Sequence, residues 1–267
     1  MRRLVLSVVA TLLTLPASAD TRTICTLVAD ANSGQTLVEE GDCAQRMSPA
    51  STFKITIGLM GFDAGILKSP SAPELPFREG YIDWRPEWKQ ATTPSRWMKH
   101  SVVWYSQQIT QRLGEKRYKA YVEKFDYGNR DVSGDPGKAN GLTNAWLSSS
   151  LQISPVEQVE FLRKLVGREL PVSEAAVTNT AAILDYGVQD GGWQLYGKTG
   201  AGLPRGADGQ VVKGQPFGWF VGWAQRDGRT IVFARLIQDS NRQSTPPGFR
   251  ARDGLIADLL GTESPLN

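Results

Sequence analysis

The chain of 267 residues contains a single histidine, His100, and only two cysteines. It therefore offers little scope for a Ser-His-Asp triad, in which histidine is the general base. A zinc site is also disfavoured, because zinc is held mainly by histidine and cysteine. The small net charge of +3 gives no indication of a nucleic-acid partner. We interpret His100 as a surface or structural residue, and an acyl-transfer enzyme of this composition would more readily use a lysine base.

Long apolar runs are scarce as well, and the most pronounced one lies near the N-terminus. Arg2 and Arg3 precede the apolar stretch Leu4–Leu15, and the small residues Ala17-Ser18-Ala19 follow it. The stretch is shorter than the roughly 20 residues that span a bilayer. This order is typical of a signal peptide, residues 1–19, cleaved after Ala19. We therefore expect a periplasmic protein without a membrane span.

The two cysteines, Cys25 and Cys43, flank a predicted hairpin. Residues 26–29 and 36–38 read as strands, and Asn32-Ser33-Gly34 between them reads as a turn. A hairpin centred near residue 34 places position 25 opposite position 43. Because export leads to an oxidising compartment, we expect a Cys25–Cys43 disulfide, with two free buried thiols as the alternative.

Apolar periodicity and turn residues predict an alternation of sheet and helix. Besides the hairpin over 24–40, strands are expected over 193–198, 217–225 and 230–238. Helices are expected over 51–64, 101–113 and 115–125, from Ser154 onward, over 173–184 and over 249–260. This order predicts an α+β protein whose sheet is built from both ends of the chain.

The same order suggests two lobes. Residues 20–50 and 185–267 would form a sheet lobe, and residues 51–184 a mainly helical lobe inserted between them. We expect the active site at the interface between the lobes.

Ser51 and Lys54 have the spacing of a nucleophile and its general base. A serine hydroxyl becomes a good nucleophile only when a base takes its proton. At the start of a helix, residues three apart share one face, which brings the amine within reach of the hydroxyl. The pattern is common by itself, and an N-cap serine followed by a surface lysine is the alternative.

Two further motifs follow in order. Ser101-Val102-Val103 places a serine at the start of a predicted helix, where it could pass a proton to a leaving nitrogen or simply cap the helix. Lys198-Thr199-Gly200 stands at the end of a predicted strand. Its ammonium and hydroxyl can face a carboxylate, its glycine lets a substrate approach the backbone, and N–H groups at the strand edge can bind an oxyanion.

The ordered motifs S-x-x-K, S-x-V and K-T-G are typical of penicillin-recognising serine enzymes. With Tyr127-Gly128-Asn129, Trp146-Leu147 and the run Gly-Trp-Phe-Val-Gly-Trp at 218–223, they make essentially the whole mature chain resemble a class D β-lactamase of the oxacillinase type. The resemblance implies the serine β-lactamase and penicillin-binding-protein fold, an antiparallel sheet flanked by helices. It also implies hydrolysis of penicillins and cephalosporins, and hence antibiotic resistance.

The resemblance assigns the covalent chemistry to particular residues. The serine matching Ser51 is acylated, and the lysine matching Lys54 carries a carbamate (N6-carboxylysine) formed from CO2 or bicarbonate, with no metal or other cofactor. An apolar pocket, with Val103 and Leu147 as candidate walls, would lower the lysine pKa and free its amine to attack CO2. The tryptophan matching Trp146 donates its indole N–H to the carbamate.

The resemblance also assigns proton transfer and oxyanion binding. The serine matching Ser101 passes the proton to the β-lactam nitrogen, and the lysine matching Lys198 assists it and attracts the substrate carboxylate. The backbone N–H groups of Ser51 and Ala201 would form the oxyanion hole.

Substrate binding would involve Thr199, Gly200 and an arginine on the last helix. Arg252 matches the family's carboxylate-binding arginine best, and Arg250 is the alternative. Alanine at position 201, where many members have an aromatic residue, and the glycine-rich segment Gly202–Gln215 depart from the family. Both could open the site to bulkier substrates such as oxyimino-cephalosporins.

Two other functions use the same acylation motifs. A penicillin-binding transpeptidase or carboxypeptidase would turn β-lactams over slowly, and a β-lactam receptor domain would be acylated irreversibly. Trp146 and the predicted absence of a membrane tether favour the hydrolase. Its expected partner is a small-molecule β-lactam, and the sequence leaves open whether the protein is a monomer or a homodimer.

Overall fold

The computed structural model describes residues 21–206 and 208–266, so the predicted signal peptide 1–19 lies outside it. Its main feature is a six-stranded antiparallel sheet with the strand order β2-β1-β6-β5-β4-β3. The strands are β1 (Thr21–Asp30), β2 (Thr36–Gly41), β3 (Asp185–Val188), β4 (Gln194–Gly202), β5 (Phe217–Arg226) and β6 (Arg229–Asp239). Both ends of the chain therefore contribute to one sheet, as the sequence predicts.

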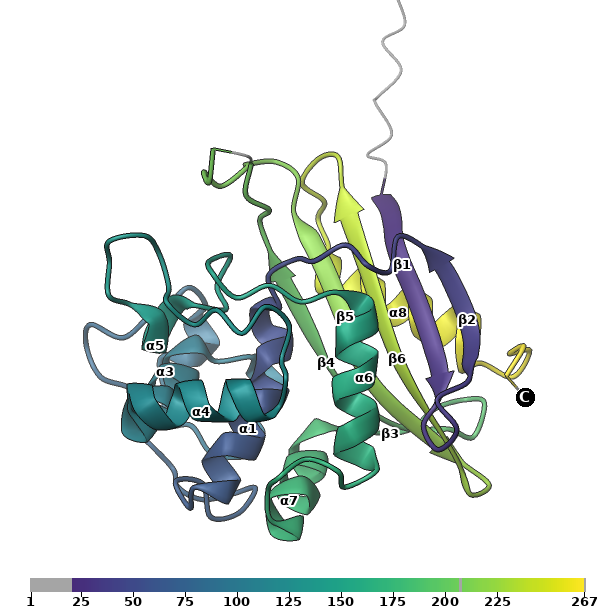
Figure 1. Cartoon of the computed structure of the whole chain (residues 1–267), viewed down its shortest axis with the longest axis horizontal. Helices are drawn as coiled ribbons and strands as arrows, with labels where there is room; N and C mark the ends of the chain where they lie inside the picture. The colour runs from purple at the N-terminus through teal and green to yellow at the C-terminus, as the bar shows by residue number, and fades with distance from the viewer. Residues whose placement is uncertain (1–20, 207, 267) are drawn as a thin grey trace, which may run out of the picture.

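The helices lie on both faces of the sheet and beside it (Figure 1). They are η1 (Ala50–Phe53), α1 (Lys54–Asp63), η2 (Pro86–Trp88), α2 (Pro94–His100), α3 (Val103–Leu113), α4 (Glu115–Lys124), α5 (Gly141–Asn144), α6 (Pro155–Val166), α7 (Glu174–Leu184) and α8 (Pro247–Leu259). Helix α8 packs against β4, β5 and β6, whereas α6 packs against β1, β5 and β6. Helices α1 and α3–α5 gather beside the β4 side of the sheet (Figure 1).

The central strands are buried on both faces because helices cover both sides. Every residue of β5 from Phe217 to Ala224 is buried. Such strands read as nearly continuous hydrophobic runs rather than alternating ones. One core lies between the sheet and α8, and a larger one joins the opposite face to the helices. Among the described residues, no helix is both long and apolar enough to cross a membrane.

The predicted hairpin and disulfide are confirmed. Strands β1 and β2 pair antiparallel, with Val28 opposite Val38, and a disulfide joins Cys25 to Cys43. The capping signal at Ser154 is also confirmed, since Ser154 and Glu157 form a reciprocal capping box at the start of α6. At the β5–β6 turn, Asp227 and Gly228 both have positive φ angles, as a two-residue type I′ hairpin turn requires.

Two local predictions need correction, and one short helix was missed. The helix expected from residue 101 begins at Val103, because Ser101 has φ +56°, a left-handed conformation that ends α2. The strand expected to end at 198 continues to Gly202, so Lys198 lies in its middle, paired with Val221. Helix α2 was not predicted, although Thr93 caps it and Pro94 opens it.

Candidate active site

The predicted nucleophile and base lie together at the start of the first long helix. Ser51 is in the 3-10 turn η1, and Lys54 is the first residue of α1. A hydrogen bond joins Nζ of Lys54 to Oγ of Ser51 at 3.0 Å. The three-residue spacing thus brings the two groups into direct contact, which is the geometry that proton transfer between them requires.

Lys54 is completely buried, although its side chain is ionisable. Burial, reinforced by the positive charges of Lys198 and Arg85, holds the pKa of the Lys54 amine well below its usual range. Removing an ammonium group from water disfavours its charged form, and nearby cations disfavour it further. The surroundings of Lys54 therefore favour a neutral amine, which can act as a base or a nucleophile.

Trp146 is buried beside this pair and has an unsatisfied donor. Its ring centroid lies 5.8 Å from that of Phe53, the residue directly before Lys54. Its indole Nε1 has no hydrogen-bond partner among the residues that the structure describes. Leaving a buried donor unpaired costs about 1–3 kcal/mol, so such a group calls for an acceptor. A carboxylate carried by Lys54 is chemically suited to accept from it, because an indole only donates.

A cavity of about 710 Å³ opens in front of Ser51. Most of the predicted site residues line it: Ser51, Ser101, Val103, Leu147, Lys198, Thr199, Gly200, Ala201 and Arg252. Lys54 and Trp146 are fully buried and do not belong to its lining. The structure therefore brings into one place residues that are spread over two hundred positions of the chain.

Strand β4 forms one wall of the cavity and packs tightly on the nucleophile turn. A side chain at Gly200 would lie 3.0 Å from the carbonyl oxygen of Pro49 and 3.1 Å from the backbone nitrogen of Thr52. The sequence suggested that this glycine lets a substrate approach the backbone. The close approach that the structure records is instead to the η1 turn, so Gly200 keeps β4 against Ser51.

Lys198 is almost as buried as Lys54 but is held differently. Its Nζ donates to the carbonyl oxygen of Thr199 at 2.9 Å. Burial, together with the charges of Arg85 and Arg252, lowers the pKa of Lys198 to about 7. An anion that enters the cavity would therefore raise the pKa of Lys198, because a nearby negative charge favours the ammonium form.

The two candidate arginines of α8 occupy different surroundings. Arg252 lines the cavity, forms an ion pair with Asp253 at 2.7 Å and lies over the rings of Phe249 and Tyr186. Arg250 forms an ion pair with the buried Asp239 and donates to Thr21 Oγ1 at 2.6 Å. The guanidinium of Arg250 is thus bound to residues at the end of the sheet, whereas that of Arg252 faces the cavity.

Several other tryptophans belong to the core rather than to the site. Trp104, Trp219 and Trp223 are core residues, each no more than 4% exposed. Trp88 is also buried, and its indole donates to the carbonyl oxygen of His100 at 2.9 Å. His100 itself is partly exposed at the cavity and has a lowered pKa, because burial and neighbouring cations disfavour its charge.

Sequence reasoning missed other residues of the site. Ser48 Oγ donates to the carbonyl oxygen of Trp146 at 2.8 Å and accepts from the backbone N–H of Ser148 at 3.0 Å. Trp84, which is 67% exposed, and Arg85 line the outer part of the cavity. A short Trp-Arg-Pro sequence within an irregular segment gave no signal that would place it there.

Comparisons with known proteins agree with this geometry. Residues 24–258 match the family model for the penicillin-binding protein transpeptidase domain. Beta-lactamase OXA-9 of Klebsiella pneumoniae is 46% identical, covering 91% of this chain and 89% of that protein. Beta-lactamase OXA-1 of Escherichia coli is 38% identical, covering 88% of this chain and 83% of that protein.

Solved structures give the same result. The crystal structure of the class D β-lactamase OXA-427 is 51% identical, with a TM-score of 0.83, covering 87% of this chain and 95% of that one. The C-terminal domain of the Bacillus licheniformis BlaR penicillin receptor is 25% identical, with a TM-score of 0.74, covering 89% of this chain and 90% of that one. The chain belongs to the penicillin-binding protein transpeptidase family and, within it, to the class D serine β-lactamases.

Proposed function

We propose that the protein hydrolyses the β-lactam ring of penicillins and cephalosporins through an acyl-enzyme on Ser51. The observation that carries the proposal is the 3.0 Å hydrogen bond between Ser51 Oγ and the buried Lys54 amine, whose pKa is lowered. As Ser51 loses its proton, its oxygen bonds to the lactam carbonyl carbon and the ring C–N bond breaks. Water then attacks the ester, which releases the opened product and restores the serine.

We further propose that Lys54 carries a carbamate. The neutral amine that its burial favours can bond to the carbon of CO2 with loss of one proton. The unpaired indole N–H of Trp146 supplies a donor suited to the resulting anion. When present, the carbamate supplies an anionic base for both acylation and deacylation. Val103 and Leu147 limit the water around it from the cavity side.

The other residues divide the remaining tasks. Ser101 passes a proton to the leaving β-lactam nitrogen, and Lys198 supports this transfer through its charge. The backbone N–H groups of Ser51 and Ala201 stabilise the oxyanion. Arg252, rather than Arg250, binds the substrate carboxylate, because Arg252 lines the cavity whereas Arg250 is paired with Asp239.

The substrate range follows from the outer part of the cavity. Alanine at position 201 leaves room that an aromatic residue would fill, which favours oxyimino-cephalosporins. Arg85 and Lys99 line the same cavity, and the ion pair of Arg85 with Glu87 is loose, at 3.9 Å. We therefore infer a preference for β-lactams whose acyl side chain carries a second anionic group.

Cleavage after Ala19 would release the enzyme into the periplasm, where it would protect the cell from β-lactams. The proposed partner is a small-molecule β-lactam, for which a cavity of about 710 Å³ has room.

A turnover experiment tests the proposed function. Purified mature protein is mixed with a chromogenic cephalosporin in large excess, with and without added bicarbonate. Sustained turnover that rises with bicarbonate is expected. A single burst equal to the enzyme concentration would instead indicate a receptor domain or a slow transpeptidase.

A further inference from the structure

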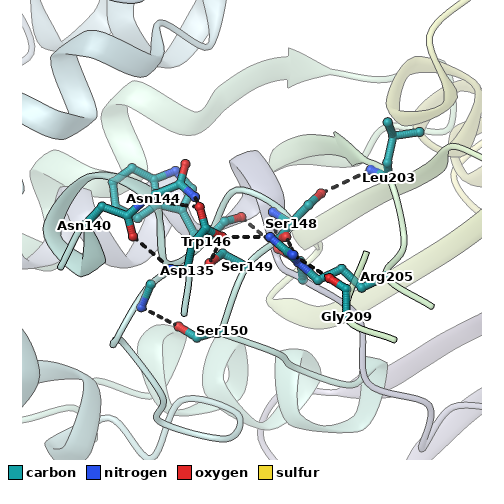
Figure 2. Close-up of polar contacts among 12 residues, drawn as sticks. Asp135, Asn140, Asn144, Trp146, Ser148, Ser149, Ser150, Leu203, Arg205 and Gly209 are labelled. Atoms are coloured by element: carbon teal, nitrogen blue, oxygen red, sulfur yellow. Dashed lines mark hydrogen bonds and ion pairs between the residues drawn. The ribbon is translucent and has the colours of Figure 1, made fainter. Parts of the chain in front are cut away.

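The loop between β4 and β5 is folded back against the segment that carries Trp146. Within this loop Arg205 and Val211 form an isolated bridge. The guanidinium of Arg205 makes an ion pair with Asp135 at 2.7 Å and also donates to the carbonyl oxygens of Ser148 and Gly209 (Figure 2). One side chain thus joins the loop to two separate points of the helical region. At Arg205, the glycine-rich segment is therefore held against the helical region by these contacts.

Asp135 connects this arginine to both sides of Trp146. Its carboxylate accepts from Nδ2 of Asn144 at 2.8 Å, two residues before Trp146, and from Oγ of Ser149 at 2.8 Å, three residues after it. It also accepts from Nδ2 of Asn140 at 3.2 Å. Figure 2 shows these groups converging around the turn that contains Trp146. The turn is therefore fixed at both ends by one carboxylate.

A second set of bonds holds the same turn from the side of the nucleophile. Ser148 has φ +52°, a left-handed conformation that costs free energy and persists only when its surroundings impose it. Its Oγ accepts from the backbone N–H of Leu203 at 3.1 Å, and its own N–H donates to Ser48 Oγ. Ser48 Oγ in turn donates to the carbonyl oxygen of Trp146. The backbone of Trp146 is thus connected both to the β4–β5 loop and to the segment before Ser51.

We propose that Arg205 and Asp135 form a clamp that positions the indole N–H of Trp146 for the carbamate on Lys54. The inference rests on the proposed carboxylation of Lys54. Residues that orient metal ligands commonly change metal affinity by about 10–100-fold, and we expect a comparable effect of residues that orient the donor to a carbamate. A partly exposed ion pair contributes little to global stability, so the effect of the clamp is on carbamate affinity rather than on folding. Arg205 is a positioning residue, because it acts through the Trp146 turn.

The test compares three variants with the wild type and a control. Arg205→Ala removes the contacts of the guanidinium with Asp135 and Ser148 but leaves the hydrogen bonds of Asp135 to the Trp146 turn, and Asp135→Asn removes the charge of the carboxylate. Trp146→Phe removes the indole N–H itself. Arg163→Ala is the matched control, because Arg163 is a similarly exposed arginine paired with Glu160 on α6, away from the loop. Carbamate occupancy is measured from the 13C NMR signal of enzyme titrated with 13C-bicarbonate, and turnover is measured over the same titration.

We expect Arg205→Ala and Asp135→Asn to raise the bicarbonate concentration for half occupancy about tenfold, with turnover restored at saturating bicarbonate. Trp146→Phe should raise it at least as much, and Arg163→Ala should leave it unchanged. A role limited to shaping the substrate site would change KM without moving the bicarbonate dependence. Wild-type occupancy in both clamp variants, at unchanged melting temperature, would overturn the clamp alone. A wild type with no carbamate signal would overturn the carboxylation of Lys54 and the clamp with it.

Discussion

Helices α1 and α8 hold the charged groups of the site in opposite ways. At the start of α1, Lys54 is completely buried, contacts Ser51 and lies in surroundings that favour a neutral amine. On α8, Arg252 is partly exposed and paired with Asp253 at the cavity. The first arrangement suits covalent chemistry, whereas the second suits the binding of an anion. Changes at Lys54 should therefore stop turnover, and changes at Arg252 should weaken substrate binding.

The largest effect is expected from Lys54→Ala. The variant lacks the base that activates water, so an acyl-enzyme that does form should persist. Steady-state turnover of benzylpenicillin should fall at least about a thousandfold. Intact-mass spectrometry should show the penicillin adduct on Lys54→Ala long after the wild type has released it. Turnover within tenfold of the wild type would show that Lys54 is not the base.

The second prediction separates the two arginines of α8. Arg252→Ala should raise KM for benzylpenicillin about 10–100-fold, because a charge-assisted hydrogen bond contributes about 1.5–3 kcal/mol. Arg250→Ala is the matched control, and its KM should change little, since Arg250 is paired with Asp239. Steady-state kinetics checks both. The reverse result, with Arg250→Ala more affected, would assign carboxylate binding to Arg250.

The third prediction concerns the pH dependence of stability. Burial and the cations Arg85 and Arg252 lower the pKa of Lys198 to about 7. Between pH 7 and the usual lysine pKa near 10.5, the unfolded chain therefore keeps a proton that the folded chain has lost. Stability rises with pH wherever the unfolded state binds more protons. Lys198 should contribute up to about 1.4 kcal/mol per pH unit to that rise.

Denaturant unfolding at several pH values between 7 and 10 measures this contribution. The free energy of unfolding of Lys198→Met should rise less steeply over that range than that of the wild type. Parallel curves for the two proteins would mean that Lys198 keeps its ordinary pKa in the folded state.

The smallest effect is expected at the outer part of the cavity. Carbenicillin differs from benzylpenicillin by a second carboxylate on its side chain, so the pair isolates the contribution of that charge. Arg85→Gln should lower kcat/KM for carbenicillin relative to benzylpenicillin about threefold to tenfold, as a partly exposed charge contact allows. Lys116→Gln, on α4 and outside the lining of the cavity, is a control for loss of general positive charge. An unchanged ratio would mean that Arg85 does not contact the side chain.

The parts of the site that depend on local spacing could be predicted from the sequence. Ser51 and Lys54 meet because residues three apart share a helix face, and the hairpin signals around Gly34 predicted the disulfide. Arg205 and Asp135 are 70 positions apart and meet only through the tertiary fold. No local sequence pattern could therefore predict their ion pair. Helix α2 was missed for another reason. Thr93-Pro94 is a recognisable signal for the start of a helix. The surrounding prolines and tryptophans show little helical periodicity, so the segment was interpreted as irregular.

The proposed hydrolysis depends most directly on Ser51 as the nucleophile, and Ser51→Ala tests that role. The variant is mixed with a chromogenic cephalosporin at saturating bicarbonate, and turnover and intact mass are followed together. We expect no covalent adduct and no turnover above the rate without enzyme, while the wild type turns over continuously. Continued hydrolysis by a folded Ser51→Ala protein would show that Ser51 is not the nucleophile.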